Sequence, residues 1–473
     1  MKAMICSTPA AHFRVWSRTA ALGPGPERAG ACQGIESRIG DLSDYGNPDD
    51  WREAGGGMLP GKLGCSLSSQ PQTQKSSPAS AGCPGQRPDD PYTLEAATHT
   101  LSDILRDAAV AYGKALTDLT VPLQQLAKVL GNRLAEEAED LEGPARTRLE
   151  AARHGLIRRI DSMLLPWRAM LRDLEAGTMD GFVDWFSVER SGQREFDVGL
   201  HRHWIDPTKP FADVVLAPSH GVVVTSATLR DETGDGVDEE GWRHAEVRTG
   251  FNHLVLPGKR SSHVSPFDYA AQARVFIVND LKKNEMEQVA GAYRALFEAS
   301  GGGALGLFTA ISRLKQVYRH LAPSLANAGL PLLAQHVDAF DPGTLIDIFR
   351  AEDHSCLLGT DAIRDGVDVP GAALRLIVFD RVPWPRPSVL HRARRDAFGA
   401  RKYDEMLVRL RLKQAFGRLI RRQDDHGVFV MLDGATPSRL LTAFPPGVPV
   451  DRIGLKEAIE KTGAFLSDRV VSG

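Results

Sequence analysis

The sequence predicts an α/β protein in which a parallel β-sheet is covered by helices on both faces, preceded by an α-helical region and a disordered N-terminal segment. Three observations predict this arrangement. Residues 1–92 show neither the helical period of about 3.6 residues nor the strand period of about 2.0. Residues 94–176 show the helical period, and after Gly221 short β-branched runs alternate with helical stretches.

Residues 1–92 are rich in Gly, Pro and Ser and contain the runs Gly-Pro-Gly-Pro and Gly-Gly-Gly. Such a composition favours a segment that is disordered or foreign to the fold. Residues 1–22 contain no acidic residue and include Arg14 and Arg18, which also allows a transit peptide. The apolar stretch of a secretory signal is missing, so we expect a cytoplasmic protein.

Four of the five cysteines, which are Cys6, Cys32, Cys65 and Cys83, lie in this N-terminal segment. Their spacings match no zinc pattern, so we expect unpaired thiols, no metal site and no iron–sulfur cluster. A zinc or iron–sulfur site built from these four cysteines is the alternative. His201 and His203 are spaced as metal ligands can be, but alternation along a strand with one partner missing favours a structural role.

Composition and charge exclude few classes of function. Charged residues make up 25% and hydrophobic residues 42% of the chain, as in ordinary folded proteins. No apolar run approaches the roughly 18 residues of a membrane span, so no membrane role is expected. The net charge is -3, so any binding of nucleic acid requires a local basic surface.

Residues 93–178 carry three amphipathic patterns that predict two or three antiparallel helices with a charged outer face. The apolar stripes are Leu101, Ile104, Leu105, Ala108 and Tyr112; Leu126, Leu130, Leu134 and Ala138; and Leu149, Ala152, Leu156 and Ile160. We expect a helical accessory domain rather than a site.

The alternating pattern after Gly221 predicts the parallel sheet. The expected strands are 222–224, 274–278, 304–308, 355–358, 374–379 and 428–432, and the expected helices are 286–299, 313–328, 345–351 and 405–420. Ligands of such sheets lie at the carboxyl ends of the strands, which directs attention to the residues that follow each strand.

Small hydroxyl side chains follow three of these strands. Thr225-Ser226-Ala227-Thr228 ends the first strand, where a structural turn is the alternative interpretation. Thr309 and Thr360 follow two later strands and could hold consecutive phosphates of a nucleic-acid backbone. Residues 365–371 then form a Gly-bracketed loop with Asp368 at its middle, which could also be an ordinary connection between a strand and a helix.

Gln414, Gly417, Arg418 and Arg421 fall at spacings of three and four, which places them on one face of a predicted helix. Two guanidinium groups on one face favour an anion between them. A γ-phosphate is such an anion, and an inserted arginine stabilises the charge of phosphoryl transfer. The alternative is a basic surface helix, because Arg411, Lys413 and Arg422 are near.

These segments occur in the order and context of motifs III, IV, V and VI of superfamily-two helicases, and the resemblance covers about 93–465. Gly366-Val367-Asp368 with Pro370-Gly371, the Val-Pro-Trp-Pro-Arg-Pro loop at 382–387 and Gln-Ala-Phe-Gly-Arg-Leu-Ile-Arg at 414–421 are similar to the DinG/XPD group. The resemblance implies two RecA-like lobes that clasp ATP and Mg²⁺, in a monomer that moves 5′-to-3′ on single-stranded DNA.

The resemblance also implies a role for each matching residue. Those expected at the nucleotide are Gln414, Arg418 and Arg421, with the arginines as fingers, and Gly366, Asp368 and Gly417. Those expected to couple the lobes are Ser226, Ala227 and Thr228, and those expected at the DNA backbone are Thr309 and Thr360. Gln335 and Phe349 fit a short family motif between IV and V. Arg364-Asp365 departs from the usual aromatic and acidic pair before Gly-Val-Asp.

Two segments that such an enzyme needs are not found in the sequence. One is Gly-x-x-x-x-Gly-Lys-[Ser/Thr], which cradles phosphates, and the other is Asp-Glu-x-His, which holds magnesium. Residues 56–62 approach the first, but Leu63 replaces the hydroxyl and no strand precedes them. Asp238-Glu239-Glu240 lies after the Ser-Ala-Thr strand, which is the wrong place for the second.

We therefore expect the C-terminal portion of a DinG-type DNA helicase, truncated upstream of about residue 92, that hydrolyses little ATP alone. The alternative is a non-catalytic module that binds nucleic acid or a partner and does not respond to nucleotide. The expected domains are a disordered or non-native segment (1–92), a helical accessory domain (93–178), a remnant of the first RecA-like lobe (179–262) and the second lobe (263–473).

Overall fold

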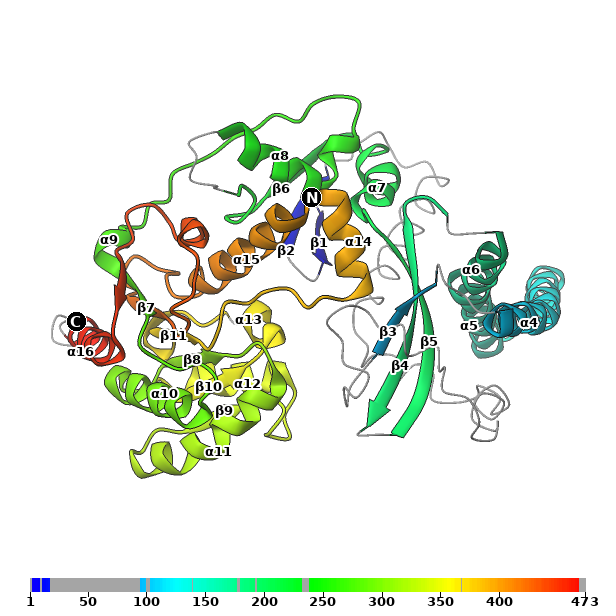
Figure 1. Ribbon diagram of the computed structural model, residues 1–473. Helices are drawn as coiled ribbons and strands as arrows, with labels where there is room; N and C mark the ends of the chain where they lie inside the picture. The colour runs from blue at the N-terminus through cyan, green and yellow to red at the C-terminus, as the bar shows by residue number, and fades with distance from the viewer. Residues whose placement is uncertain are drawn as a thin grey trace. The chain divides into compact units, whose positions relative to one another are not determined.

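The computed structural model describes residues 2–8, 11–17, 94–98, 103–137, 139–176, 179–191, 194–231, 238–366 and 368–467 (Figure 1). The chain divides into two compact units. The first comprises Met1–Ala20, Thr208–Pro385 and Gly399–Gly473, and the second comprises Ala21–Pro207 and Arg386–Phe398. Each unit is therefore assembled from segments that are far apart in the sequence.

A seven-stranded parallel sheet lies in the first unit, in the order β13-β7-β12-β11-β8-β10-β9. Its strands are β7 (Ala273–Val278), β8 (Ala304–Leu307), β9 (Leu332–Ala334), β10 (Cys356–Gly359), β11 (Leu376–Phe379), β12 (Gly427–Met431) and β13 (Val450–Ile453). Strands β8, β10, β11 and β12 are buried along their whole length, as expected for a sheet that is covered on both faces.

Helices cover the two faces of this sheet (Figure 1). One face packs against α10 (Met286–Ser300), α11 (Ile311–Asn327) and α16 (Leu455–Ser467), and the other packs against α12 (Pro342–Ala351), α13 (Asp361–Gly366) and α15 (Ala400–Phe416). Neighbouring strand residues such as Phe276 and Ile277 belong to opposite hydrophobic clusters, because side chains alternate along a strand. The predicted fold class, a RecA-like parallel sheet with flanking helices, is confirmed.

The other elements of the first unit lie outside this sheet. They are α7 (Thr208–Phe211), η5 (Ala212–Leu216), β6 (Val222–Thr225), α8 (Asp238–Thr249), η6 (Phe251–His253), α9 (Tyr269–Gln272), η7 (Gly371–Ala373) and η8 (Ser438–Ala443). Strand β6 pairs antiparallel with β2 (Ala11–Ser17), which pairs with β1 (Lys2–Thr8). The remainder of the segment predicted to be disordered lies outside the described residues, together with Cys32, Cys65 and Cys83.

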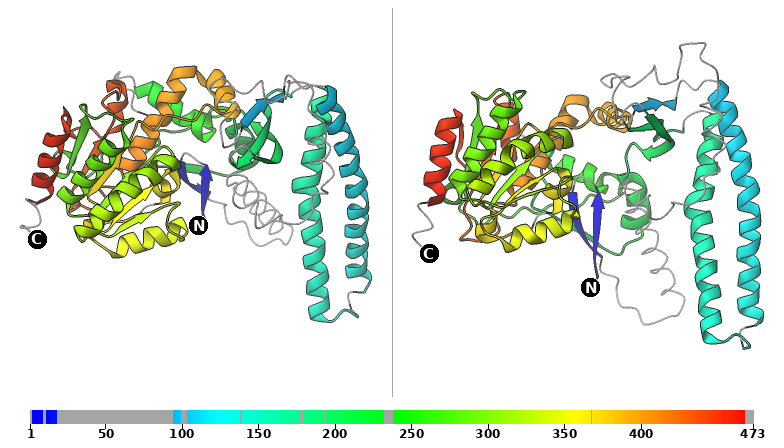
Figure 2. Two further views of the ribbon diagram at one scale, coloured as in Figure 1. Left: turned by 60° about the horizontal axis from the view of Figure 1, so that its bottom comes forward. Right: turned by 90° about the horizontal axis from the view of Figure 1, so that it is seen from below.

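The second unit combines helices with a small antiparallel sheet. Its helices are α4 (Asp103–Glu136), α5 (Gly143–Arg159), η4 (Ile160–Leu164), α6 (Leu165–Ala176) and α14 (Val389–Phe398), and its strands are β3 (Leu94–Ala97), β4 (Phe182–Ser191) and β5 (Arg194–Trp204). Figure 2 shows α4 beside the continuous run of α5, η4 and α6, so the first two of the three amphipathic patterns fall on the single helix α4. Within the described residues, no helix combines the length and apolarity needed to cross a membrane.

Several element predictions differ from the structure. Strands β9 and β13 were not predicted, because β9 has only three residues and β13 carries Asp451 and Arg452 at its centre, so neither forms an apolar run of four. The strand predicted at 222–224 is real, but it lies in the antiparallel sheet with β2. The helix predicted at 405–420 begins at Ala400 and ends at Phe416. The contact boundary at Thr208 also differs from residue 179, so the expected domain boundaries stay a prediction.

Candidate functional site

Four strands end side by side at the carboxyl edge of the parallel sheet, in the order β9, β10, β8 and β11. Each is followed, directly or one residue later, by a polar side chain: Gln335, Thr360, Thr309 and Asp380. Because ligands of open α/β sheets bind at this edge, these four residues form the first part of the candidate site.

The side chain of Gln335 fixes Thr360. The amide oxygen of Gln335 accepts hydrogen bonds from the Thr360 N–H and hydroxyl, both at 2.9 Å. Gln335 is buried and Thr360 is half-buried. A phosphate oxygen near Thr360 would therefore compete with Gln335 for the hydroxyl proton.

Asp380 fixes the neighbouring loop that carries Thr309. Its carboxylate accepts hydrogen bonds from the Thr309 N–H at 3.3 Å and from Arg313 Nε at 2.6 Å. Burial raises the pKa of Asp380, while the Arg313 guanidinium beside it acts in the opposite direction. The Thr309 side chain is exposed, so its hydroxyl is accessible from solvent.

The segment Gln414–Arg421 does not form one continuous helical face. Helix α15 ends at Phe416, and Gly417 continues into a turn in which the Arg418 N–H donates to Ala415 O at 3.0 Å. The prediction that Arg418 and Arg421 share a helix with Gln414 is therefore wrong. Leu419 and Ile420 are buried in the core and hold the turn against the sheet.

A buried carboxylate organises the loop that carries Arg421. Asp425 Oδ2 accepts hydrogen bonds from the N–H groups of Arg421 and Arg422, both at 2.7 Å, and Oδ1 accepts from the Gly371 N–H at 3.1 Å. The amide of Gln272 donates to three carbonyl oxygens of the same loop, at 3.0 to 3.2 Å. Asp425 thus joins the loop at 365–371 to the arginine segment.

The Asp425 connection brings Asp368 and Arg421 together. Arg421 Nη2 lies 3.3 Å from Asp368 Oδ1. The Asp368 side chain is 70% exposed and the Arg421 side chain 31% exposed, so this ion pair is open to competition from a bound anion. Gly366 ends α13 nearby in the sequence, and Val367 lies outside the described residues.

The Ser226–Thr228 segment forms a local turn where β6 ends. Ser226 Oγ accepts from the Thr228 N–H at 3.1 Å and lies 3.1 Å from Thr228 Oγ1, while Ala227 is exposed. Arg248 on α8 donates to the carbonyl oxygens of Thr228, at 3.3 Å, and Leu229. This geometry is the turn that the sequence left open as the structural alternative.

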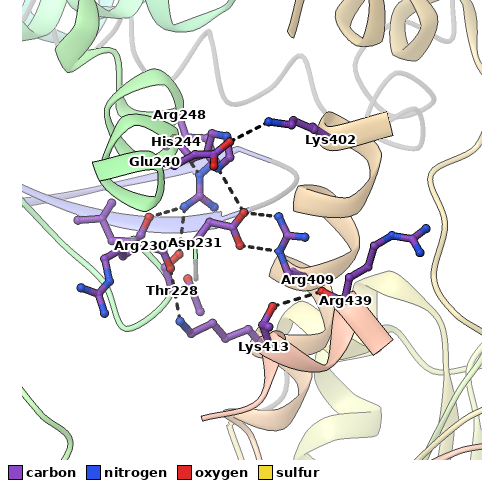
Figure 3. Close-up of polar contacts among 12 residues, drawn as sticks. Thr228, Arg230, Asp231, Glu240, His244, Arg248, Lys402, Arg409, Lys413 and Arg439 are labelled. Carbon is purple, nitrogen blue, oxygen red and sulfur yellow. Dashed lines mark hydrogen bonds and ion pairs between the residues drawn. The ribbon is translucent and has the colours of Figure 1, made fainter. Parts of the chain in front are cut away.

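An ion-pair network joins this turn to α15 (Figure 3). Arg409 donates to both carboxylate oxygens of Asp231, at 2.9 and 2.6 Å, and His244 Nδ1 lies 3.4 Å from Asp231 Oδ2. Burial alone would raise the pKa of Asp231, but the hydrogen bonds from Arg409, with the His244 ring beside them, hold it well below its usual range. Lys413, the residue before Gln414, donates from Nζ to Arg230 O at 3.4 Å.

The histidines on β5 have protein partners. His201 Nε2 lies 2.7 Å from Ser187 Oγ, and its ring stacks on Trp185 at a centroid distance of 5.1 Å. Burial lowers the pKa of His203 to about 4, with Arg394 and His201 adding to the shift. No group of three or more His, Cys, Asp or Glu residues suited to a metal occurs in the described part of the chain.

Sequence reasoning missed four charged residues of this site: Asp231, Asp380, Arg409 and Asp425. Arg409 could have been found, because it interrupts the buried stripe of α15 and a charge there requires a buried partner. Asp425 follows two arginines, a glutamine and Asp424 in a turn, so the sequence suggests a solvated acid. Only the fold places its carboxylate beneath three N–H groups.

Comparison with known proteins identifies residues 293–444 as similar to the family described as Helicase C-terminal domain. The 3'-5' exonuclease DinG of Bacillus subtilis (strain 168) is 27% identical over 279 residues, which are 56% of this chain and 29% of that protein. The ATP-dependent DNA helicase YoaA of Escherichia coli (strain K12) is 27% identical over 298 residues, 59% of this chain and 43% of that protein.

The ATP-dependent helicase DinG of Mycobacterium tuberculosis (strain ATCC 25618 / H37Rv) is 33% identical over 191 residues, 38% of this chain and 27% of that protein. A solved structure titled XPD_Helicase matches 77% of this chain and 66% of its own, with 14% identity and a TM-score of 0.40. The matched part of this chain thus spans less than half the length of each of the three relatives.

Proposed function

We propose that this chain couples the binding of ATP to the binding of single-stranded DNA, because residues 293–444 match the Helicase C-terminal domain family and the chain is similar to DinG and YoaA. In a complete enzyme, this coupling would serve ATP-driven translocation along DNA during repair or replication. The observation that carries the proposal is the contact between Arg421 and Asp368, because it joins the two segments expected at the nucleotide.

The nucleotide side of the proposal rests on accessible positive charge. We assign the phosphates of ATP to Arg418 and Arg421, with Gln414 and Gly417 at the end of α15 beside them. Asp368 and Gly366 form the facing loop. Bound ATP supplies an anionic phosphate that competes with the Asp368 carboxylate for Arg421, and a guanidinium binds phosphate oxygens well.

The same residues do not provide a magnesium site. The described residues contain no three-ligand group for a metal, and the sequence contains neither the phosphate-cradling nor the magnesium-binding motif. We therefore assign no magnesium ligand in this chain. We propose that the chain alone binds nucleotide weakly and hydrolyses it little, so robust DNA-stimulated ATP turnover by the isolated chain would contradict this part of the proposal.

The DNA side of the proposal rests on the carboxyl edge of the sheet. We assign Thr309 and Thr360 to phosphates of a single strand, because their strands β8 and β10 are neighbours and their loops are fixed by Asp380 and Gln335. Ser226, Ala227 and Thr228 are assigned to coupling between the lobes. The two hydroxyl groups carry no charge, so they position DNA rather than dominate its affinity.

The test measures the affinity of the chain for a fluorescein-labelled oligothymidylate, with and without the ATP analogue AMP-PNP and Mg²⁺. We expect nucleotide to change the affinity by about fivefold or more, which is the lower range of measured couplings. Arg421→Ala should abolish this response. Arg422→Ala is the matched control, because Arg422 is adjacent, exposed and held by the same Asp425 oxygen.

Two outcomes contradict the proposal. Salt-dependent DNA binding that ignores nucleotide in the unaltered chain would favour the non-catalytic module. Equal nucleotide responses in Arg421→Ala and Arg422→Ala would remove Arg421 from the nucleotide site.

A further inference from the structure

Two oppositely charged side chains meet in a buried position between the turn that follows β6 and helix α15 (Figure 3). Asp231 lies three residues after the Ser226–Thr228 turn, and Arg409 lies on α15. They form two hydrogen bonds of 2.6 and 2.9 Å. Their side chains are only 8% and 7% exposed. Nε of the planar Arg409 guanidinium faces Oδ1 of Asp231, and Nη2 faces Oδ2. The contact therefore fixes the orientation of the two side chains as well as their distance.

The pair lies among contacts that reach both functional segments. On one side, Arg248 donates to the carbonyl oxygens of Thr228 and Leu229, close to Asp231 in the sequence. On the other side, Lys413 donates to Arg230 O and directly precedes Gln414. The backbone that follows the Ser226–Thr228 turn is therefore held by side chains from α8 and from α15, the latter directly before the Gln414–Arg421 segment.

Burial makes the separation of Asp231 from Arg409 costly in free energy. Separating a buried ion pair leaves two uncompensated charges in a poorly solvated site, which is far more costly than separating an exposed pair. A nearby contact between α8 and α15 is different, since Lys402 and Glu240 form an ion pair at 3.1 Å in which Lys402 is 78% exposed. The turn and the helix are thus expected to move together while the buried pair is intact.

We propose that Asp231 and Arg409 are positioning residues that transmit nucleotide binding from the Gln414–Arg421 segment to the Ser226–Thr228 turn. This inference rests on the proposed function, because it assumes that nucleotide is bound near Arg421. Neither residue needs to touch ATP or DNA. Their contribution is to make two segments respond as one body, so that a change at either segment reaches the other.

The experiment compares Asp231→Asn, Arg409→Met and the double variant in the oligothymidylate assay with and without AMP-PNP and Mg²⁺. If the unaltered chain shows a nucleotide response on the order of tenfold, all three variants should reduce it to less than about twofold. Their DNA affinity without nucleotide should stay within about threefold, because no DNA contact is removed. Lys402→Gln should retain the full response as the matched exposed control.

The double variant separates positioning from folding. Removing both charges takes from the buried Arg248 the attraction of Asp231 together with the repulsion of Arg409, and it leaves neither member of the pair without its partner, so the melting temperature should recover relative to the single variants. A purely structural pair predicts that the nucleotide response recovers together with the melting temperature, and that result would overturn the inference. The positioning role predicts recovered stability without recovered response.

A second measurement requires no variant. Hydrogen exchange of the unaltered chain should show that AMP-PNP with Mg²⁺ alters protection in peptides covering 222–231 as well as 400–421. A change confined to 400–421 would overturn the inference while leaving the proposed nucleotide site intact. The absence of any nucleotide effect on exchange or DNA affinity would overturn the proposed function and this inference with it.

Discussion

Replacing Asp425 by alanine removes the acceptor of three backbone N–H groups, those of Gly371, Arg421 and Arg422. A buried donor without an acceptor costs about 1 to 3 kcal/mol. The three amides are partly buried, so water replaces some of the lost bonds, and we expect Asp425→Ala to lower the free energy of unfolding of the first unit by about 3 to 4 kcal/mol. Asp425→Asn keeps one oxygen acceptor, so roughly half that loss is expected.

The measurement is the free energy of unfolding from urea titration, followed by a probe in the first unit. Asp424→Asn is the matched control, because Asp424 is adjacent and exposed, and a surface change of this kind stays within about 0.5 kcal/mol. At this size of unit, the Asp425→Ala loss corresponds to a fall in melting temperature of roughly 10 °C. A loss for Asp425→Ala no larger than that for Asp424→Asn would refute the claim that this carboxylate joins the two loops.

Three further predictions concern residues outside the nucleotide segments. Folding lowers the pKa of His203 from 6.5 to about 4. As the pH falls from 6.5 towards 4, the unfolded chain therefore binds a proton at His203 that the folded chain does not bind, and this destabilises the fold. At about 1.4 kcal/mol per unit, the second unit should lose up to about 3 kcal/mol between pH 7 and pH 4, and His203→Gln should remove that slope in urea titrations. Burial raises the pKa of Cys356 to about 12, so iodoacetamide should label it in urea but hardly at all in the native chain, and native labelling detected by peptide mass spectrometry would contradict its burial. Gly302→Ala should abolish soluble expression or cost more than about 3 kcal/mol, because an added methyl overlaps His354 O at a φ of 86°, whereas Gly301→Ala, with its nearest neighbour at 3.6 Å, should cost about 1 kcal/mol.

Patterns of buried strands and amphipathic helices predicted the α/β sheet well, because both are local properties of the sequence. Strands at 273–278, 304–307, 356–359, 376–379 and 427–431 lie within two residues of the expected positions. The ends of elements depend on contacts that no local pattern contains. Helix α15 stops at Phe416 since Leu419 and Ile420 turn into the core and Asp425 accepts the N–H groups that follow.

The residues of the candidate site also divide into those that a local pattern indicates and those that only the fold brings together. Thr309, Thr360, Asp368 and Arg421 could be predicted as candidates because each follows a strand or forms part of a recognisable motif. Asp231 and Arg409 are separated by 178 positions and carry no mark in the sequence of belonging together. Their partnership depends on how the turn after β6 packs against α15, which only the folded chain defines.

Hydrogen exchange with and without nucleotide tests the central claim most directly, because it reports which backbone amides become protected when ATP binds. AMP-PNP with Mg²⁺ should slow exchange in peptides covering 361–374 and 414–425, and Arg421→Ala should abolish both changes. Protection that appears only elsewhere in the chain, or that persists in Arg421→Ala, would contradict the assignment of the nucleotide to Arg421 and its facing loop.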